Sequence, residues 1–347
     1  MRIEKPEGEL RRGWTTGACA AAATKAAFAA LRTGAFPDPV SIRLPKGETP
    51  SFALALEGKG EGWAQAGIVK DAGDDPDVTH GCTVIATVRS RGKGVTFKAG
   101  KGVGTVTREG LPIAVGEPAI NPIPREMMRA VIEEQGGGDV EIEISIPDGE
   151  ALAQKTWNPR LGIVGGLSIL GTTGIVHPFS CAAWIASIHR GVDVARAMGL
   201  THIAGCTGST SEDAVRAHFN LPIEAMMDMG DFAGGLLKYV REHPVSRVTI
   251  GGGFGKITKL AQGAMDLHSG RSQVDFEWLA KFAPANLHED VKAANTAQQV
   301  LDMLGAGLVS QVAGEAKLEI EKILRGAPVA ADVMIVDRAG KIIAHAE

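Results

Sequence analysis

The sequence has few aromatic residues, few cysteines and almost no net charge. Aromatic side chains make up 5% of its 347 residues, with a single tyrosine, whereas glycine occurs 45 times. This balance is typical of a glycine-rich α/β protein. The net charge of −4, from 36 basic and 40 acidic residues, excludes a global field that would recruit nucleic acid or an anionic membrane. Any anionic ligand must be held by local Lys and Arg side chains.

The four cysteines, Cys19, Cys82, Cys181 and Cys206, include no C-x-x-C pair. Their spacing argues against a zinc site or a disulfide framework, so we expect no metal and a reducing compartment. Cys19 and Cys181 lie in alanine-rich helical patterns, where a free thiol behaves as a small apolar side chain. We therefore expect none of the four to be a nucleophile.

Long apolar runs are also absent. No stretch approaches the roughly 18 apolar residues that a membrane span needs. The first residues, MRIEKPEGE, lack the apolar core of a signal peptide. We expect a cytoplasmic protein that does not bind membranes.

The length of the chain predicts two domains. Residues 1–156 contain mostly strand patterns with few helices, which predicts an α+β domain. Residues 157–347 alternate strands and helices, which predicts an α/β Rossmann-like domain with a mostly parallel sheet. The clearest helix begins with a cap at Thr15 or Thr16, continues through alanines to Leu31 and stops at Gly34. Its first amides could seat an anion, but plain capping is favoured.

The centre of the chain is the stretch 156–178, in which short apolar runs alternate with glycines. Such runs predict buried strands joined by glycine turns. The backbone amides at Gly165 and Gly166, and the loop of Gly171, Thr172, Thr173 and Gly174, suit an anionic or strongly polar small molecule. The alternative is a tight connection between two buried strands.

Two later segments place a glycine loop between an apolar strand and a helix. The first contains Thr207 and Gly208, and the second is GGGFGK at residues 251–256. Parallel α/β sheets bind ligands at the carboxyl ends of such strands. Thr207 and Gly208 therefore join the candidate binding residues.

The segment 70–81, KDAGDDPDVTHG, contains four aspartates within seven residues. Their spacing does not follow that of a calcium loop. A solvated acidic turn is one interpretation, because Asp and Pro commonly form turns. The Lys and His at its two ends favour a polar site instead.

Six segments, in their order along the chain, resemble one known family. They are GWTTGACAAAA (13–23), KDAGDDPDVTHG (70–81), GKGVGTVT (100–107), GEPAINPIPR (116–125), NPRLGIVGGLSILGTTG (158–174) and GKITKLAQG (255–263). This order is similar to that of the cobalt-precorrin-5B (C1)-methyltransferases of anaerobic cobalamin synthesis, the CbiD family. The family more often has Tyr at Trp14, Thr or Ser at Ala18 and an acidic residue at His177, which puts local specificity in doubt if His177 touches substrate.

The resemblance implies methyl transfer from S-adenosylmethionine to C1 of a ring-contracted corrinoid, giving cobalt-precorrin-6A. Cobalt would enter only as part of the substrate. The acidic-Gly-x-Gly-x-Gly loop of ordinary Rossmann methyltransferases is not found, so the donor site must be unusual. Methylation of a ring carbon by a sulfonium is an in-line displacement, for which positioning and electrostatics should supply most of the rate.

The resemblance also suggests roles for particular residues. His80, Asp74 and Asp75 are candidate bases, if ring tautomerisation must release a proton. The carboxylates of a corrinoid would be bound by Lys and Arg of the matching segments. These cations are Lys70, Arg125, Arg160, Lys256 and Lys259, each of which is equally suited to an ordinary ion pair.

Two other functions stay open at this point. The chain could be a non-catalytic corrinoid-binding escort, or an enzyme acting on a phosphorylated or nucleotide ligand through its glycine loops. The oligomeric state, monomer or homo-oligomer, is also open.

Overall fold

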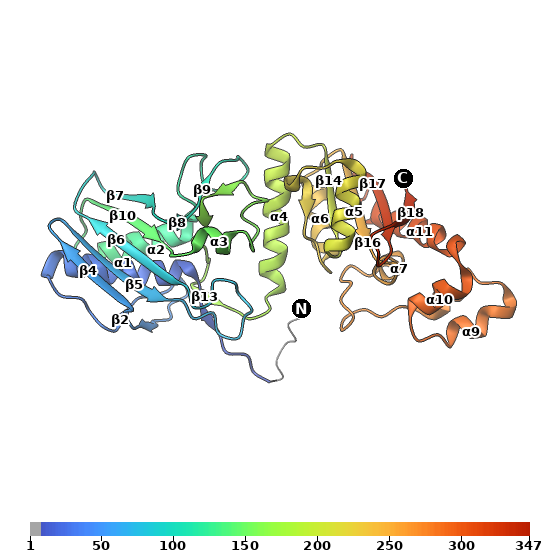
Figure 1. The fold of residues 1–347 in the computed structure, drawn as a ribbon, viewed down its shortest axis with the longest axis horizontal. Coiled ribbons are helices and arrows are strands. Elements are labelled where there is room, and N and C mark those ends of the chain that lie inside the picture. Colours follow the sequence, from blue (N-terminus) through green and yellow to red (C-terminus); the bar gives the residue numbers. More distant parts are fainter. Residues whose placement is uncertain (1–7) are drawn as a thin grey trace. The chain divides into compact units, whose positions relative to one another are not determined.

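The computed structural model describes residues 8–347, which form two compact units divided between Cys181 and Ala182 (Figure 1). The division falls after Cys181 rather than after residue 156, where the sequence placed it. The physical reason is strand pairing: the strands of the central stretch pair with β1, β8 and β9, all of which belong to the first unit. Each unit is described by itself.

The first unit is built on a five-stranded sheet in the order β4-β5-β6-β10-β7. Neighbours are antiparallel except β10 and β7, which are parallel. In β10 the apolar residues Val140, Ile142 and Ile144 alternate with polar ones and are buried. Helices α1 and α2 pack against each other, and α1 packs on β5 and β6 (Figure 1). The α+β expectation for this part of the chain is therefore met by a sheet covered by helices.

Helix α1 (Thr16–Thr33) is buried over most of its length. Its body is alanine, so its backbone can approach the sheet closely. The Thr15 side chain accepts a hydrogen bond from the Ala18 amide, and Gly34, in the left-handed conformation at φ 80°, ends the helix. The expected cap and stop are both confirmed.

The other strands and helices of the first unit are short. The strands are β1 (Gly13–Trp14), β2 (Val40–Ser41), β3 (Ser51–Phe52), β4 (Leu56–Gly60), β5 (Trp63–Val69), β6 (Thr83–Arg89), β7 (Val95–Ala99), β8 (Gly102–Val103), β9 (Thr105–Val106), β10 (Val140–Ser145), β11 (Ile163–Val164), β12 (Gly166–Leu167) and β13 (Ile175–Val176). The helices are α2 (Pro122–Glu133) and α3 (Gly149–Ala153). The central stretch, expected to form longer buried strands, forms only three two-residue strands.

The second unit contains a mixed five-stranded sheet in the order β15-β14-β16-β17-β18. Strands β15, β14, β16 and β17 are parallel, and β18 runs antiparallel to β17. The sequence's alternation of strands and helices thus corresponds to an α/β arrangement here.

The strands of this unit are β14 (His202–Cys206), β15 (Met226–Met227), β16 (Arg247–Gly252), β17 (Ala330–Val336) and β18 (Ile342–Ala346). The helices are α4 (Cys181–Ala197), α5 (Ser209–Phe219), α6 (Ala233–Glu242), α7 (Phe254–Ala261), α8 (Phe276–Ala280), α9 (His288–Lys292), α10 (Ala297–Leu304) and α11 (Ala306–Leu324), with 3₁₀ turns at Ile223–Ala225 and Ala285–Leu287. Within residues 8–347, no helix combines the length and apolar character needed to cross a membrane.

Candidate functional site

The acidic turn (residues 70–81) lies directly against the segment that leads into α1. The Trp14 amide donates to the Asp71 carbonyl at 2.7 Å, and the Asp74 amide donates to the Arg11 carbonyl at 3.0 Å. A Cβ on Gly13 would lie 2.0 Å from the carbonyl carbon of Ala72. The glycine of the Gly-Trp-Thr-Thr-Gly motif therefore permits this close contact between two segments.

Two aspartates of the turn are fixed by Arg11. Its guanidinium donates two hydrogen bonds to the Asp71 carboxylate, and its amide donates to Asp74 Oδ2 at 2.6 Å. The hydrogen bonds from Arg11 and from the Gly73 amide lower the pKa of Asp71 to about 2. Asp71 is therefore an ionised anchor for Arg11. Sequence analysis assigned no role to Arg11. The feature that could have indicated one is its position two residues before the Gly-Trp-Thr-Thr-Gly motif that begins at Gly13.

Lys70 lies inside the turn rather than on its surface. Its side chain is 1% exposed, and Nζ donates to Asp77 Oδ2 at 2.7 Å. Thr79 donates its amide and hydroxyl to the other oxygen of Asp77. Burial alone would raise the pKa of Asp77, but attraction to Lys70 and the hydrogen bonds from Lys70 and Thr79 outweigh it and lower the pKa. Lys70, expected to contact substrate, is enclosed here and positions the turn.

His80 and Asp75 differ in what they can do with a proton. His80 Nδ1 accepts a hydrogen bond from the Ala72 amide at 3.1 Å, so the neutral ring carries its proton on Nε2. On its exposed side, the His80 ring can therefore donate a hydrogen bond from Nε2. Asp75 Oδ1 accepts from the Phe179 amide at 2.8 Å, and burial raises the pKa of Asp75. A raised pKa makes Asp75 a better proton acceptor than an ordinary exposed aspartate.

The central stretch completes the amino-terminal end of α1. The Gly17 amide donates to the Leu170 carbonyl at 3.0 Å, and the Leu170 amide donates to Thr16 Oγ1 at 3.0 Å. The Thr15 amide donates to the Gly174 carbonyl at 3.0 Å. Since the chain itself occupies these groups, the start of α1 is capped and not an open anion seat.

The glycines of the central stretch are of two kinds: some lie in close contact with neighbouring residues, and others have open space where a Cβ would be. A Cβ on Gly171 would lie 2.3 Å from Thr15 Oγ1, and one on Gly166 would lie 2.2 Å from Gly102. These two glycines are required by close contacts. A Cβ on Gly165 would meet no atom within 4 Å, and its φ of +89° requires glycine for conformational reasons.

The loop of residues 171–174 leaves its backbone amides available. Within the part of the chain that the structure describes, these four amides donate to no other residue. Thr172 is exposed, whereas Thr173 Oγ1 is used in a local turn, bonding the amide and carbonyl of Ile175. Thr172 and the amides are thus the part of this loop that can meet a ligand.

Asn158 bonds to residues 166 and 168 of the central stretch, and sequence analysis assigned it no role. It is 6% exposed, donates Nδ2 to the Gly166 carbonyl at 2.9 Å and accepts from Ser168 Oγ at 3.0 Å. The sequence signal was an asparagine before Pro159 at the start of one of the six matching segments.

Arg125 and Arg160 occupy different environments in the first unit. Arg125 donates to the carbonyls of Ile120 and Pro118 at 2.8 and 3.0 Å, so it holds a loop. Arg160 lies over the Trp157 ring, with its guanidinium carbon 5.8 Å from the ring centroid.

Lys256 and Lys259 have internal partners in the second unit. Lys256 Nζ pairs with Asp231 at 2.9 Å and donates to the Thr207 carbonyl at 3.0 Å. Lys259 Nζ donates to the Leu267 carbonyl at 2.6 Å, and burial lowers its pKa. Both ammonium groups therefore hold loops together.

Thr207 and Gly208 lie at the carboxyl end of β14, as expected. The Thr207 amide donates to the Gly251 carbonyl at 2.9 Å, which continues the pairing of β14 with β16. A Cβ on Gly252 would lie 2.8 Å from Thr207 Oγ1. The ends of the two strands are therefore closely packed.

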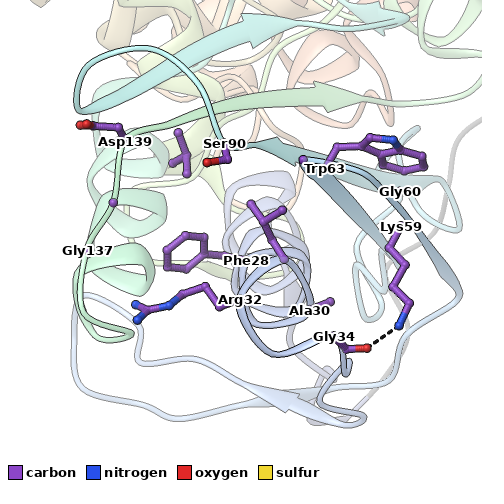
Figure 2. A pocket seen from close by; sticks show the side chains of 14 residues that line it. Phe28, Ala30, Arg32, Gly34, Lys59, Gly60, Trp63, Ser90, Gly137 and Asp139 are labelled. Carbon is purple, nitrogen blue, oxygen red and sulfur yellow. Dashed lines mark hydrogen bonds between the residues drawn. The ribbon is translucent and has the colours of Figure 1, made fainter.

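A hollow of the first unit lies elsewhere, at the carboxyl end of α1 (Figure 2). Its volume is about 550 Å³, and Phe28, Arg32, Lys59 and Trp63 are among its lining residues. None of the residues proposed from the sequence lines it. Arg32 and Lys59 donate to the carbonyls of Gln135 and Gly34, so both cations bind carbonyls just after the carboxyl ends of α2 and α1.

Metal and thiol chemistry were expected to be absent. In the described range 8–347, no three or more His, Cys, Asp or Glu side chains are grouped to hold a metal ion. All four cysteines are unbridged: Cys19 and Cys206 are buried, Cys82 is half-buried, and Cys181 is exposed. Burial raises the pKa of Cys19 to about 12 and that of Cys82 to about 11.

Comparison with known proteins decides the family. The model of the CbiD family matches residues 3–178, and the model of the CbiD C-terminal domain matches residues 266–347. The chain belongs to the CbiD family. Relatives from Brucella canis and Brucella suis, both named cobalt-precorrin-5B C(1)-methyltransferase, are 62% identical over 99% of this chain and 97% of theirs.

A solved CbiD structure from Archaeoglobus fulgidus, titled a cobalamin biosynthesis protein, is also similar. Its sequence is 30% identical to this one. The match covers 78% of this chain and 86% of the Archaeoglobus chain, with a TM-score of 0.41. The matches to the family models and to the Brucella relatives confirm, at the level of the CbiD family, the resemblance that the six motifs indicated.

Proposed function

We propose that this chain is an S-adenosylmethionine-dependent methyltransferase. Its reaction would transfer a methyl group to C1 of cobalt-precorrin-5B, giving cobalt-precorrin-6A in cobalamin biosynthesis. The supporting observation is 62% identity, over 99% of the chain, to proteins named for this activity. We propose a cytoplasmic enzyme whose second unit is Rossmann-like, on the basis of its four parallel strands.

The donor supplies an electrophilic methyl group on a sulfonium. The protein's task is then to align the sulfonium with the ring carbon and to stabilise charge, without a covalent intermediate. The open amides of residues 171–174 and the Thr172 hydroxyl suit a carboxylate. Both the methionine part of the donor and the rim of a corrinoid carry one. We assign this loop to such a carboxylate.

A corrinoid also presents apolar surface and several rim carboxylates. Val78 in the acidic turn and Leu170 in the central stretch are 39% and 50% exposed and suit the apolar surface. Arg12 is exposed and forms no ion pair with any described residue, so it is available to a carboxylate in two-point contact. We assign the rim carboxylates to Arg12 and Arg160.

Asp75 is the residue we assign to proton removal, should methylation leave the ring with a proton to lose. Its raised pKa favours acceptance, and its Oδ1 is oriented by the Phe179 amide. His80 is assigned to hydrogen-bond donation from Nε2.

The proposal is tested by incubating purified protein with methyl-labelled S-adenosylmethionine and cobalt-precorrin-5B. The label should appear in a product one methyl group heavier by mass spectrometry. A reaction without protein gives the background. Binding of the corrinoid without transfer, in the presence of active donor, would instead identify an escort protein.

A further inference from the structure

One bulky residue of the first unit is held in a backbone conformation that favours glycine. Phe179 has a φ of 55°, inside the left-handed region. A Cβ makes this region unfavourable, because it lies too close to a backbone carbonyl oxygen. An aromatic residue therefore occupies the region only where other contacts outweigh this cost, and strained positions of this kind cluster at active sites.

Helix ends account for the other non-glycine residues in this conformation. Within residues 8–347 these are Asp148, Asn220 and Arg325. Asn220 and Arg325 end α5 and α11, and their amides donate to carbonyls of the preceding turns, as left-handed caps commonly do. Asp148 precedes α3, and aspartate tolerates the left-handed region. Phe179 lies between β13 and α4 and ends no helix, so its conformation has another cause.

The Phe179 amide bonds to a carboxylate that lies 104 residues away in the sequence. It donates to Asp75 Oδ1 at 2.8 Å, within the first unit. Hydrogen bonds to an ionised acceptor are about twice as strong as those between neutral groups. The bond is therefore strongest while Asp75 is charged, and it supplies the contact that keeps Phe179 in the left-handed region.

Within the described residues 8–347, no group besides the Phe179 amide donates a hydrogen bond to the Asp75 carboxylate. Burial raises the pKa of Asp75, and the hydrogen bond from Phe179 opposes this. Asp77 raises the pKa and Lys70 lowers it through their charges, but Lys70 Nζ is already paired with Asp77 at 2.7 Å. The amide is therefore the direct partner that stabilises the ionised form of Asp75. The other charged or titratable side chains of the segments that meet here are Asp71, Asp74 and His80 in the turn, His177 and Cys181 beside Phe179, and Arg11, which bonds to the turn.

We propose that Phe179 is a positioning residue for methyl transfer: its left-handed backbone holds its amide on Asp75 and keeps that carboxylate ionised and ready to accept a proton. The backbone amide performs this role, and the phenyl ring takes no part in the proton step. The inference rests on the proposed function, because it takes Asp75 as the base of the methyltransferase. It goes beyond that assignment by naming the contact that sets the lower pH limit of turnover.

The first test removes the amide hydrogen alone. Nonsense suppression with phenyllactic acid at position 179 replaces the N–H of the full chain by an ester oxygen and keeps the phenyl ring. Methyl transfer from labelled S-adenosylmethionine is then measured as kcat against pH. Because the ionised carboxylate loses its donor, the acidic limb of the profile should move up by roughly one to two pH units. The donor KM should change little, because the loss concerns the reacting step.

The matched control is the same ester at Phe36. This residue also lies outside the helices and strands of the first unit, and its amide donates to no other residue in the described part of the chain. Its pH profile should coincide with that of the wild type. Equal shifts in the two ester proteins would show a general effect of the ester and overturn the inference.

The second test addresses the backbone conformation. Phe179→Gly and Phe179→Ala both remove the ring and keep the amide, but glycine enters the left-handed region without the cost of a Cβ. Phe179→Gly should therefore unfold at a higher urea concentration than Phe179→Ala, and both should keep the acidic limb of the wild-type profile. A lower unfolding midpoint for Phe179→Gly would show that the conformation at position 179 is not left-handed and would overturn the inference.

The outcomes separate this inference from the proposed function. Wild-type protein that transfers the methyl group, with a pH profile equal to that of the ester at position 179, overturns the inference and leaves the methyltransferase proposal standing. A wild-type profile without an acidic limb does the same, because no carboxylate would then have to be ionised for turnover. Wild-type protein that transfers no labelled methyl group overturns both.

Discussion

Three aspartates within one turn differ in their affinity for protons. Hydrogen bonds from Arg11 lower the pKa of Asp71 to about 2, Lys70 lowers that of Asp77, and burial raises that of Asp75. Environment, rather than residue type, therefore assigns their roles. Two carboxylates hold the turn in shape, and one is suited to exchange a proton.

Replacing Asp75 tests its assigned role. Asp75→Asn keeps an oxygen that can accept from the Phe179 amide but removes the base, so turnover should fall roughly 100-fold or more. The donor KM should change little, because the loss concerns the reacting step. Steady-state kinetics would check this alongside Asp213→Asn, the same change at an exposed carboxylate on α5, and near-normal kcat in Asp75→Asn would remove it from the chemistry.

The same residue makes stability depend on pH. A raised pKa means that the folded chain binds the Asp75 proton more tightly than the unfolded chain does, whose value is near 3.8. Its contribution to stability is therefore present at low pH and lost as pH rises through the folded-state pKa. Denaturant unfolding from pH 4 to 7 should show the wild type losing stability relative to Asp75→Asn. Parallel curves would contradict the raised pKa.

The cysteines give a third prediction. Because the thiols of Cys19 and Cys82 are held protonated by burial, neither is a ready nucleophile. A chain with all four cysteines replaced by Ala or Ser should retain methyl transfer within a few fold. Loss of activity in any correctly folded single variant would show that a thiol takes part.

At the scale of elements, the start of α1 depends on the central stretch. Gly171→Val would place a β-branched side chain on the Thr15 cap, at a backbone φ of +130° that favours glycine. It should therefore lower the free energy of unfolding by about 2–4 kcal/mol. A loss of binding in this variant would report damage to the fold, so Gly171→Val is a poor probe of the ligand site.

The exposed Thr172→Val supplies the matched comparison. It should leave stability within about 0.5 kcal/mol of the wild type and weaken binding of the carboxylate ligand. Equal denaturation midpoints for Gly171→Val and Thr172→Val would refute the packing role of Gly171.

Elements with local signals could be predicted from the sequence, and those that depend on distant pairing could not. The alanine run with Thr15 and Gly34 predicted α1, and the strand patterns of residues 1–156 predicted a strand-rich first unit. The central stretch was assigned to the wrong unit because its partner strands lie far away in sequence. A two-residue strand is also too short to show a hydrophobic pattern from which its partner strand could be predicted. For the same reason, the sequence suggested Lys70 as a ligand residue but could not show its burial against Asp77.

At the scale of the whole molecule, each unit has a core of its own. Alanines of α1 pack with Ile142, Ile144 and Met128 in the first unit, and Met226 packs with Met334 in the second. Independent cores predict that residues 1–181 fold cooperatively when expressed alone. Residues 1–156 should not, because they lack β11, β12 and β13. Circular dichroism with urea unfolding would compare the two, and a cooperative transition in the shorter fragment would contradict the division.

The pairing of β1 with β13 also sets the timing of folding during synthesis. Trp14 pairs with Ile175, 161 residues later (175 minus 14), so the ribosome must add those residues before the entrance to α1 can close. At a translation rate of about 5–20 residues per second, this delay lasts roughly 8–30 s. Throughout most of it, the Gly17 amide and the Thr16 hydroxyl of the nascent helix lack their partner Leu170. Alanine side chains expose far less apolar area than leucine or phenylalanine side chains would. Before α1 is packed, chaperones and neighbouring nascent chains therefore find little apolar surface on it to bind. The alanine composition that permits close packing in the finished protein thus also protects the unfinished one from aggregation.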